Sequence, residues 1–185
     1  MQGWQRVVLW AVLLTPLLIQ TYRYLSGSEF YGEYLHWTGD GSVWLLLIVL
    51  AITPLRRFLR SAFWTSWLVK ARRDLGISTA VYALAHTVAY LARKADLERV
   101  LADAAEVGML VGWLALVGML VLAATSNDRA VRSLGGHWKS VHRWIYPIAL
   151  LSVGHWVLTA FDPTVAYANL AVVILLLLVR IRTSA

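Results

Sequence analysis

A helix needs about 20 residues to cross a bilayer, and six apolar stretches of this 185-residue chain approach that length, although the second is short and is expected to borrow Trp37 and Thr38 at its start. They run over 7–25, 41–55, 76–92, 107–125, 144–161 and 165–179. Hydrophobic residues make up 59% of the chain and the mean hydropathy is +0.64, which is too apolar for an ordinary soluble domain. The sequence therefore predicts an all-α fold, a polytopic membrane bundle of six transmembrane helices.

Basic residues gather on one side of these stretches, and this asymmetry predicts the orientation. That side has 13 of the 17 Lys and Arg residues: Arg6, Arg56, Arg57, Arg60, Lys70, Arg72, Arg73, Arg129, Arg132, Lys139, Arg143, Arg180 and Arg182. The other side has eight of the ten acidic residues: Glu29, Glu33, Asp40, Asp96, Glu98, Asp103, Glu106 and Asp162. Because cytoplasmic loops are enriched in Lys and Arg, both termini are expected in the cytoplasm. The net charge of +7 then reflects topology, and no nucleic-acid partner is expected.

Composition also limits the chemistry and the domain organisation. The chain has no Cys, which excludes thiolate ligation of haem, iron–sulfur clusters and dithiol relays, so any redox chemistry needs a bound cofactor. Few residues follow the last stretch, so we expect one membrane domain over 1–185 and no soluble flavin or nicotinamide domain. The basic connection 56–74 contains Phe63, Trp64 and Trp67, which suit an interfacial anchor or a docking site for a soluble partner.

Three histidines, His86, His142 and His155, are the most informative residues for function. An ionisable side chain in the hydrocarbon region is costly and usually functional, and neutral imidazole is an axial ligand of haem iron. From the helix rise, His86 lies about 16 Å and His155 about 18 Å from the cytoplasmic ends of their stretches. The two are therefore predicted to face each other at one depth and to hold a haem between the third and fifth helices.

His142 lies 13 residues before His155, at the cytoplasmic mouth of the fifth stretch. This spacing suits a second, inner haem or an electron entry point. However, it turns the two side chains about 140° apart on a straight helix. Pro147 lies between them and predicts a local distortion. The second ligand of an inner haem stays open: His137, a non-histidine ligand, water or a second protomer.

Other interpretations of the same residues are a proton or ion pathway and helix–helix hydrogen bonds. The apolar stretches contain no Asp or Glu, which argues against a proton pump. Arginines near the inner site can pair with haem propionates or can simply reflect the charge asymmetry: Arg72, Arg73, Arg132 and Arg143.

Several short segments carry a family resemblance. They are TPLRR (Thr53–Arg57), RRDLG (Arg72–Gly76) with His86 ten residues on, TS (Thr125–Ser126), and LGGHWKSVHRWIY (Leu134–Tyr146) with His155 after it. In this order they resemble the ferric reductase-like transmembrane family, and most closely the MsrQ-type haem-binding subunits of periplasmic methionine sulfoxide reductase systems.

The resemblance implies six helices and one or two b-type haems, with ligands at His86, His142 and His155. It implies an electron-transfer subunit of the bacterial inner membrane that does not act alone on the final substrate. Its donor would be a cytoplasmic flavin reductase or the quinone pool, with FMN or quinone at the cytoplasmic side. Its acceptor would be a periplasmic molybdopterin-type reductase that repairs methionine sulfoxide.

Two departures from the family pattern leave alternatives open. The family's Arg-Pro-Tyr stretch before the fourth span is absent, since 104–113 reads AAEVGMLVGW, and the common Leu before the fifth-span histidine is Val141. The first departure lies where a periplasmic partner would dock. The alternatives are a ferric or other metal reductase component, which would reduce chelated iron by itself, and a non-redox scaffold or transporter, which would purify colourless.

Overall fold

The computed structural model describes residues 2–59 and 62–182, and this part of the chain is helical without strands. It forms two compact units, residues 1–95 and 96–185, which are treated in turn. Arg60, one of the basic residues counted above, lies outside the described residues.

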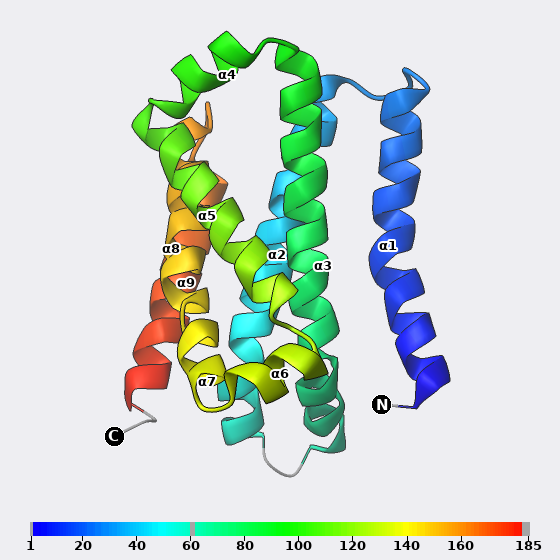
Figure 1. The fold of residues 1–185 in the computed structure, drawn as a ribbon, viewed down its shortest axis with the longest axis vertical. Helices are drawn as coiled ribbons and strands as arrows, with labels where there is room; N and C mark the ends of the chain where they lie inside the picture. Colours follow the sequence, from blue (N-terminus) through cyan, green and yellow to red (C-terminus); the bar gives the residue numbers. More distant parts are fainter. Residues whose placement is uncertain (1, 60–61, 183–185) are drawn as a thin grey trace. The chain divides into compact units, whose positions relative to one another are not determined.

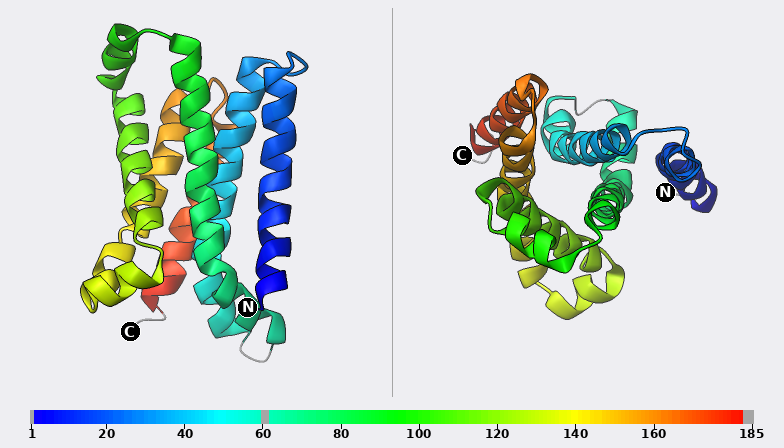
Figure 2. Two further views of the ribbon diagram at one scale, coloured as in Figure 1. Left: turned by 45° about the vertical axis from the view of Figure 1, so that its right-hand side comes forward. Right: turned by 90° about the horizontal axis from the view of Figure 1, so that it is seen from above.

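The first unit contains three helices: α1 (Gly3–Leu25), α2 (Tyr31–Phe58) and α3 (Phe63–Lys94). Helices α2 and α3 run antiparallel, side by side along their length (Figures 1 and 2). Side-chain hydrogen bonds fix their register: Ser42 Oγ to Thr79 O at 3.1 Å, Arg72 Nη1 to Thr53 Oγ1 at 3.1 Å, and Arg56 Nη1 to Thr65 Oγ1 at 2.7 Å. The core between them is aliphatic: Val43, Leu46, Val49, Leu50, Ile52, Leu75 and Ala80.

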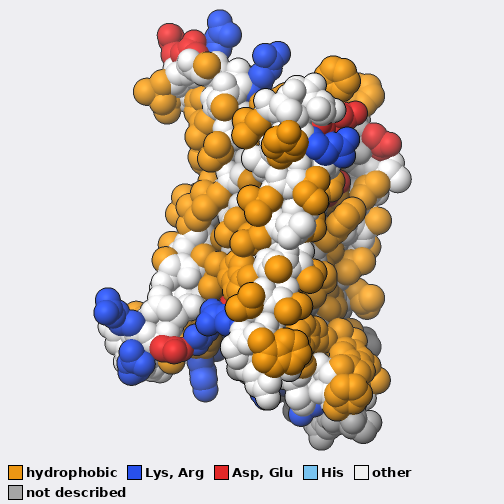
Figure 3. Space-filling view, turned by 90° about the vertical axis from the view of Figure 1, so that its right-hand side faces the viewer, with side chains coloured by type: hydrophobic (Ala, Val, Ile, Leu, Met, Phe, Trp, Pro, Cys, Tyr) orange, Lys and Arg blue, Asp and Glu red, His pale blue; other side chains and the backbone are white. Residues whose placement is uncertain are grey.

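Helix α1 is held chiefly by polar contacts. Its buried side chains are Leu9 and Leu17, and most of its apolar surface faces outward; on the face drawn in Figure 3 the charged side chains lie at helix ends. Polar contacts join α1 to α2 and α3 at three levels: Arg6 and Trp10 to Asp74, Tyr82 Oη to Leu13 O, and Thr21 Oγ1 to Tyr34 Oη. Polar groups suit this task because burying apolar surface gives no driving force between helices in lipid.

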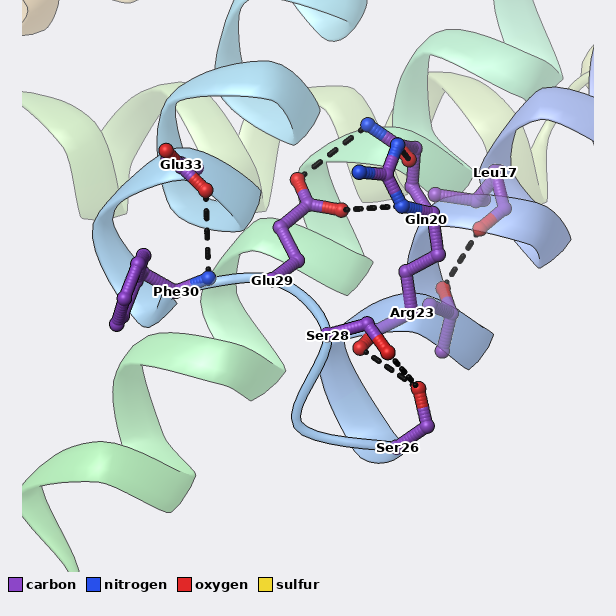
Figure 4. Close-up of polar contacts among 9 residues, drawn as sticks. Leu17, Gln20, Arg23, Ser26, Ser28, Glu29, Phe30 and Glu33 are labelled. Carbon is purple, nitrogen blue, oxygen red and sulfur yellow. Dashed lines mark hydrogen bonds and ion pairs between the residues drawn. The ribbon is translucent and has the colours of Figure 1, made fainter.

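A buried carboxylate closes the α1–α2 turn (Figure 4). The Glu29 side chain is 5% exposed; Gln20 Nε2 donates to its Oε1 at 3.3 Å, and Arg23 Nε lies 3.8 Å from its Oε2. Gly27 sits in this turn at φ +77°, a conformation that side-chain-bearing residues rarely adopt. The acidic end of the first unit is thus an ordered polar cap.

The second unit contains six described helices. They are α4 (Leu97–Ala104), α5 (Val107–Ala124), α6 (Asp128–Leu134), α7 (His137–His142), α8 (Ile145–Thr159) and α9 (Thr164–Arg182). Helix α8 packs against both α5 and α9 (Figure 1). Gly108, Gly112 and Gly118 of α5 face side chains of α8, and the GxxxG spacing of the first two is the pattern that allows close approach of membrane helices.

The helix is interrupted between α7 and α8, at Arg143 and Trp144. Pro147 has no N–H to give to Arg143 O, and that carbonyl accepts instead from Tyr146 N at 3.3 Å. The distortion expected between His142 and His155 is therefore present, and the two histidines are on separate helices.

Each of the six predicted apolar stretches coincides with a helix over most of its length, although 107–125 and 144–161 run past the ends of α5 and α8. The all-α prediction is therefore confirmed. Four described helices, α1, α2, α3 and α5, are long and apolar enough to cross a membrane. A helix of at least 18 residues is needed for a candidate span. Helix α8 has 15 residues, and the apolar part of α9, Thr164–Arg180, is also shorter than 18. The count of six spans and the cytoplasmic position of both termini stay predictions.

The expectation of a long basic connection over 56–74 is wrong. Helix α2 continues to Phe58 and α3 already begins at Phe63, so Trp64 and Trp67 lie in a helix. The long helices also include three acidic residues outside the apolar stretches, Glu33 and Asp40 in α2 and Asp74 in α3. A hydropathy pattern indicates only the lipid-facing part of a helix. Backbone hydrogen bonding continues the helix beyond that part, into segments that contain polar residues.

Candidate functional site

His86 projects from α3 onto the backbone of α2. Its Nδ1 lies 2.9 Å from the carbonyl oxygen of Leu35. A carbonyl oxygen only accepts, so the imidazole must donate, and Nδ1 carries the hydrogen. In the neutral ring the lone pair is then on Nε2, the nitrogen farther from the α2 backbone.

His155 repeats this arrangement in the second unit. It projects from α8 onto α5, and its Nδ1 lies 2.8 Å from the carbonyl oxygen of Gly108. The same reasoning places the hydrogen on Nδ1 and the lone pair on Nε2 in the neutral ring. The contact with a carbonyl holds each imidazole in one orientation and one tautomer. Both side chains are half-buried, so neither ring is fully enclosed.

Each imidazole also packs against a glycine of the helix that it contacts. A Cβ added to Gly39 would lie 3.0 Å from His86 Nδ1, and one added to Gly112 would lie 2.6 Å from His155 Nδ1. The absence of a side chain is therefore what lets each ring reach the carbonyl.

Each histidine lies toward the C-terminal end of its own helix. Along α3, His86 is about 18 Å from Asp74, and along α8, His155 is about 15 Å from Ile145. Both are nearer the acidic than the basic end of their unit: Leu35 and Gly108 lie in the first turns of α2 and α5. The depth of each histidine in a membrane, the outer haem and the pairing of His86 with His155 stay predictions.

His142 has a different environment. It is the last residue of α7, and its Nε2 lies 3.1 Å from Thr125 Oγ1, just past the end of α5. That hydroxyl donates to Val121 O at 2.8 Å, so it accepts from His142, and Nε2 carries the hydrogen. The ring of His142 stacks on Trp138, with centroids 4.0 Å apart, and Trp138 Nε1 donates to Thr125 O at 2.9 Å. In the neutral ring the lone pair of His142 is therefore on Nδ1, the reverse of His86 and His155.

The predicted propionate partners belong to different units. Arg73 is half-buried on α3, beside Arg72, while Arg143 is exposed between α7 and α8, and its Nη2 donates to Ser140 Oγ at 2.9 Å. Arg132 is exposed on α6. Their role toward a haem stays a prediction.

Side chains alone do not form a classical metal centre in the described part of the chain. No group of three or more His, Cys, Asp or Glu residues there could hold a metal ion. His36 and His137 are exposed, so they do not enlarge the set. Single imidazoles suit haem, because the porphyrin supplies the equatorial ligands of the iron and the protein adds only axial ones.

Sequence reasoning missed the partners of these histidines. Leu35 and Gly108 act through backbone carbonyls, which every residue has, so no sequence signal marks them. Gly39 and Gly112 were visible only as glycines in apolar stretches. Thr125 was noted as part of a family segment, but its bond to His142 depends on the turn between α5 and α7.

The helices and half-buried imidazoles described above define a multi-pass membrane protein. Residues 38–153 match the family described as ferric reductase like transmembrane component, a stretch that includes His86 and His142 and ends two residues before His155. The chain belongs to the ferric reductase-like transmembrane family.

Two curated relatives carry the name protein-methionine-sulfoxide reductase heme-binding subunit MsrQ. The protein from Ralstonia nicotianae is 34% identical over 160 residues, which cover 82% of this chain and 71% of the relative. The protein from Herminiimonas arsenicoxydans is 35% identical over 148 residues, which cover 75% of this chain and 66% of the relative, a little under two thirds of its length. No solved structure matches the chain.

Proposed function

We propose that this chain is a haem-binding membrane subunit that carries electrons to a methionine sulfoxide reductase. The names of its relatives point to the methionine sulfoxide reductase system, and the histidines provide candidate ligands for a haem. The observation that carries the proposal is the repeated contact of His86 and His155, each donating Nδ1–H to a backbone carbonyl. In metal sites this contact fixes the tautomer and the ring orientation and makes the opposite nitrogen a better ligand.

The residues present fit an axially ligated haem. His86 and His155 would hold it through Nε2, the ring nitrogen opposite the one that contacts a backbone carbonyl. Bound haem would supply a one-electron carrier of the b type. The protein fixes the ligands, keeps the dielectric low and limits the access of water.

His142 is proposed to serve a second, inner haem or the entry point for electrons. Its Nε2 donates to Thr125, so ligation through that nitrogen requires the ring to leave the hydroxyl. Arg73 and Arg143 are the proposed propionate partners at that level, since a guanidinium matches a carboxylate in a two-pronged geometry.

The direction of transfer is proposed from the charge pattern. The basic ends face the cytoplasm of a bacterial inner membrane and receive electrons from a flavin reductase or quinol, with FMN or quinone bound there. The acidic ends face a periplasmic molybdopterin-type reductase. The basic residues at the cytoplasmic end also favour anionic membrane lipid.

The first experiment is the reduced-minus-oxidised visible spectrum of the purified protein, with haem measured per polypeptide. A low-spin b-type spectrum is expected, and His86→Ala and His155→Ala should each abolish the outer haem. His36→Ala is the matched control, because that imidazole is exposed on α2. A colourless protein after haem supplementation refutes the proposal, and full haem in both the His86 and His155 variants refutes the ligand pair.

His142→Ala separates one haem from two. Loss of part of the haem signal supports two sites, and loss of all of it supports one haem with a different ligand pair. Unchanged haem content would show that His142 is not a ligand. That outcome would agree with the bond between its Nε2 and Thr125.

A second candidate is a free-standing ferric reductase component, which the description of the matched family favours. It predicts reduction of chelated iron by the haem-loaded protein without a protein acceptor. The methionine sulfoxide system instead predicts oxidation of the reduced protein only when its reductase is added.

A further inference from the structure

We propose that Gly39 and Gly112 are positioning residues for the two histidines, and that each forms one device with the carbonyl four residues before it. This inference rests on the proposed haem function, because the device matters most for an imidazole that must ligate through Nε2. In the first unit the device is Leu35 O with Gly39, and in the second it is Gly108 O with Gly112.

The spacing of four residues has a geometric reason. In an α-helix, residues i and i+4 lie one above the other on the same face. The carbonyl of residue i points toward residue i+4, so an imidazole that reaches this oxygen from a neighbouring helix must pass over position i+4. A Cβ at position i+4 crowds the ring, severely at Gly112 and by a few tenths of an ångström at Gly39.

The crowding differs between the two devices, and this gives a graded expectation. At Gly112 an added Cβ would lie 2.6, 2.8 and 2.9 Å from Nδ1, Cε1 and Cγ of His155. At Gly39 the matching distances to His86 are 3.0, 3.2 and 4.0 Å. A methyl group at position 112 therefore displaces the whole His155 ring, including Cγ. A methyl group at position 39 presses only on the edge of the His86 ring that contains Nδ1 and Cε1.

Two other glycines provide matched controls, because they are at least as crowded but face a side chain other than histidine. A Cβ on Gly41 would lie 2.7 Å from the ring of Tyr82, on the same pair of helices as Gly39. A Cβ on Gly118 would lie 2.6 Å from Ile148, on the same pair as Gly112. Alanine at these positions disturbs helix packing to a similar degree and leaves both imidazole contacts in place.

The first device has an additional member. Thr38 Oγ1 lies 3.0 Å from Leu35 O, so it shares with His86 the oxygen that accepts Nδ1–H. Thr38 is fully buried and also donates to Tyr34 O at 2.8 Å. Thr38→Val removes this competing donor with little change in side-chain shape, so it should strengthen the contact of His86 where Gly39→Ala weakens it.

The experiment compares the haem-loaded wild type with Gly39→Ala, Gly112→Ala, Gly41→Ala and Gly118→Ala. Haem affinity should fall about 10- to 100-fold in Gly112→Ala, the range found when such an outer contact of a ligand is lost. The loss should be smaller in Gly39→Ala. Both control variants should keep wild-type affinity even where their thermal stability drops.

The midpoint potential of the haem is a second readout. A general loss of stability would not shift this potential in opposite directions in two variants. A strong Nδ1–H contact makes the ligand more basic and favours oxidised iron, so Gly39→Ala should raise the potential and Thr38→Val should lower it. Equal potentials in both variants would overturn the role of the carbonyl contact.

A measurement on the haem-free protein keeps this inference separate from the proposed function. Nitrogen NMR of labelled histidines should show the Nδ1–H tautomer for His86 and His155 in the wild type and its loss in Gly112→Ala for His155. If the wild type binds no haem, the proposed function fails while this test still stands. If it binds haem and all four alanine variants behave alike, the positioning role is refuted.

Discussion

Breaking the contact between Arg6 and Asp74 should loosen α1 from α3 by an amount that the structure allows us to work out. Three donors converge on Asp74 Oδ1: Arg6 Nε at 3.0 Å, Arg6 Nη2 at 2.7 Å and Trp10 Nε1 at 3.2 Å. The Asp74 side chain is 5% exposed, whereas that of Arg6 is 53% exposed. The carboxylate is therefore costly to leave without these donors, while the guanidinium can return to water.

This asymmetry sets the magnitudes. A hydrogen bond to a charged group contributes about 1.5–3 kcal/mol, but an exposed ion pair contributes at most about 1 kcal/mol because solvent screens it. Arg6→Ala should therefore lower the free energy of unfolding by about 1–2 kcal/mol, since it leaves the buried carboxylate with fewer donors. The coupling energy between Arg6 and Asp74 should be about 1 kcal/mol, within the range measured between membrane helices.

The assay is a double-mutant cycle with Arg6→Ala, Asp74→Ala and the double variant, each unfolded reversibly in mixed micelles. Lys70→Ala is the charge control, because Lys70 is exposed on the same helix as Asp74. A coupling energy below about 0.3 kcal/mol, the usual limit of additivity, would refute the conclusion that this contact attaches α1. An equal loss of stability in Lys70→Ala would assign the effect to net charge instead.

Three further predictions concern single contacts. Tyr82→Phe removes the hydroxyl that donates to Leu13 O at 2.9 Å and should lower the free energy of unfolding by about 0.5–1.5 kcal/mol in the same assay; unchanged stability would contradict the contact. Thr125→Val removes the acceptor of His142 Nε2–H, so nitrogen NMR should show a mixture of tautomers for His142, and a retained Nε2–H form would show that Thr125 does not hold the ring. Hydrogen bonds from Thr164 lower the pKa of Asp162, so this carboxylate should stabilise the start of α9 at neutral pH and lose that effect as the pH falls through the lowered pKa. Hydrogen exchange at the Thr164 amide should be slower in wild type than in Asp162→Ala at neutral pH and equal in acid; a difference that persists in acid would contradict the assignment.

Apolarity was a reliable guide to where the helices are and a poor guide to where they end. Each of the six apolar stretches coincides with a helix over most of its length, but α2 begins at Tyr31, ten residues before its stretch, and α3 begins at Phe63, thirteen before its own. The extra turns mix aromatic with polar and charged residues, among them Asp40 and Asp74. Backbone hydrogen bonding drives these extensions, and a hydropathy pattern does not record it.

The histidines could be selected from the sequence because ionisable groups are rare in apolar stretches. Which of these histidines lie on the same helix could not be predicted from the sequence. Sequence spacing put His142 with His155 in one segment, whereas the break at Arg143 and Trp144 places them on different helices. The register of α2 against α3, and of α5 against α8, decides which carbonyl and which glycine each ring meets, and register arises from long-range packing.

The two devices have different sequences, which indicates what they share. Residues 35–39 read LHWTG and residues 108–112 read GMLVG, and only the final glycine is common. Both present a carbonyl to Nδ1–H and an open position one turn later, on helices that pack against the histidine's own helix in antiparallel fashion. The shared element is thus backbone geometry and the absence of one side chain. His142 has neither feature, because a hydroxyl and an indole hold it instead through the opposite nitrogen. If one arrangement prepares an imidazole for ligation through Nε2, His86 and His155 form one class of ligand. Ligation through Nε2 of His142 would instead require displacement of the Thr125 hydroxyl.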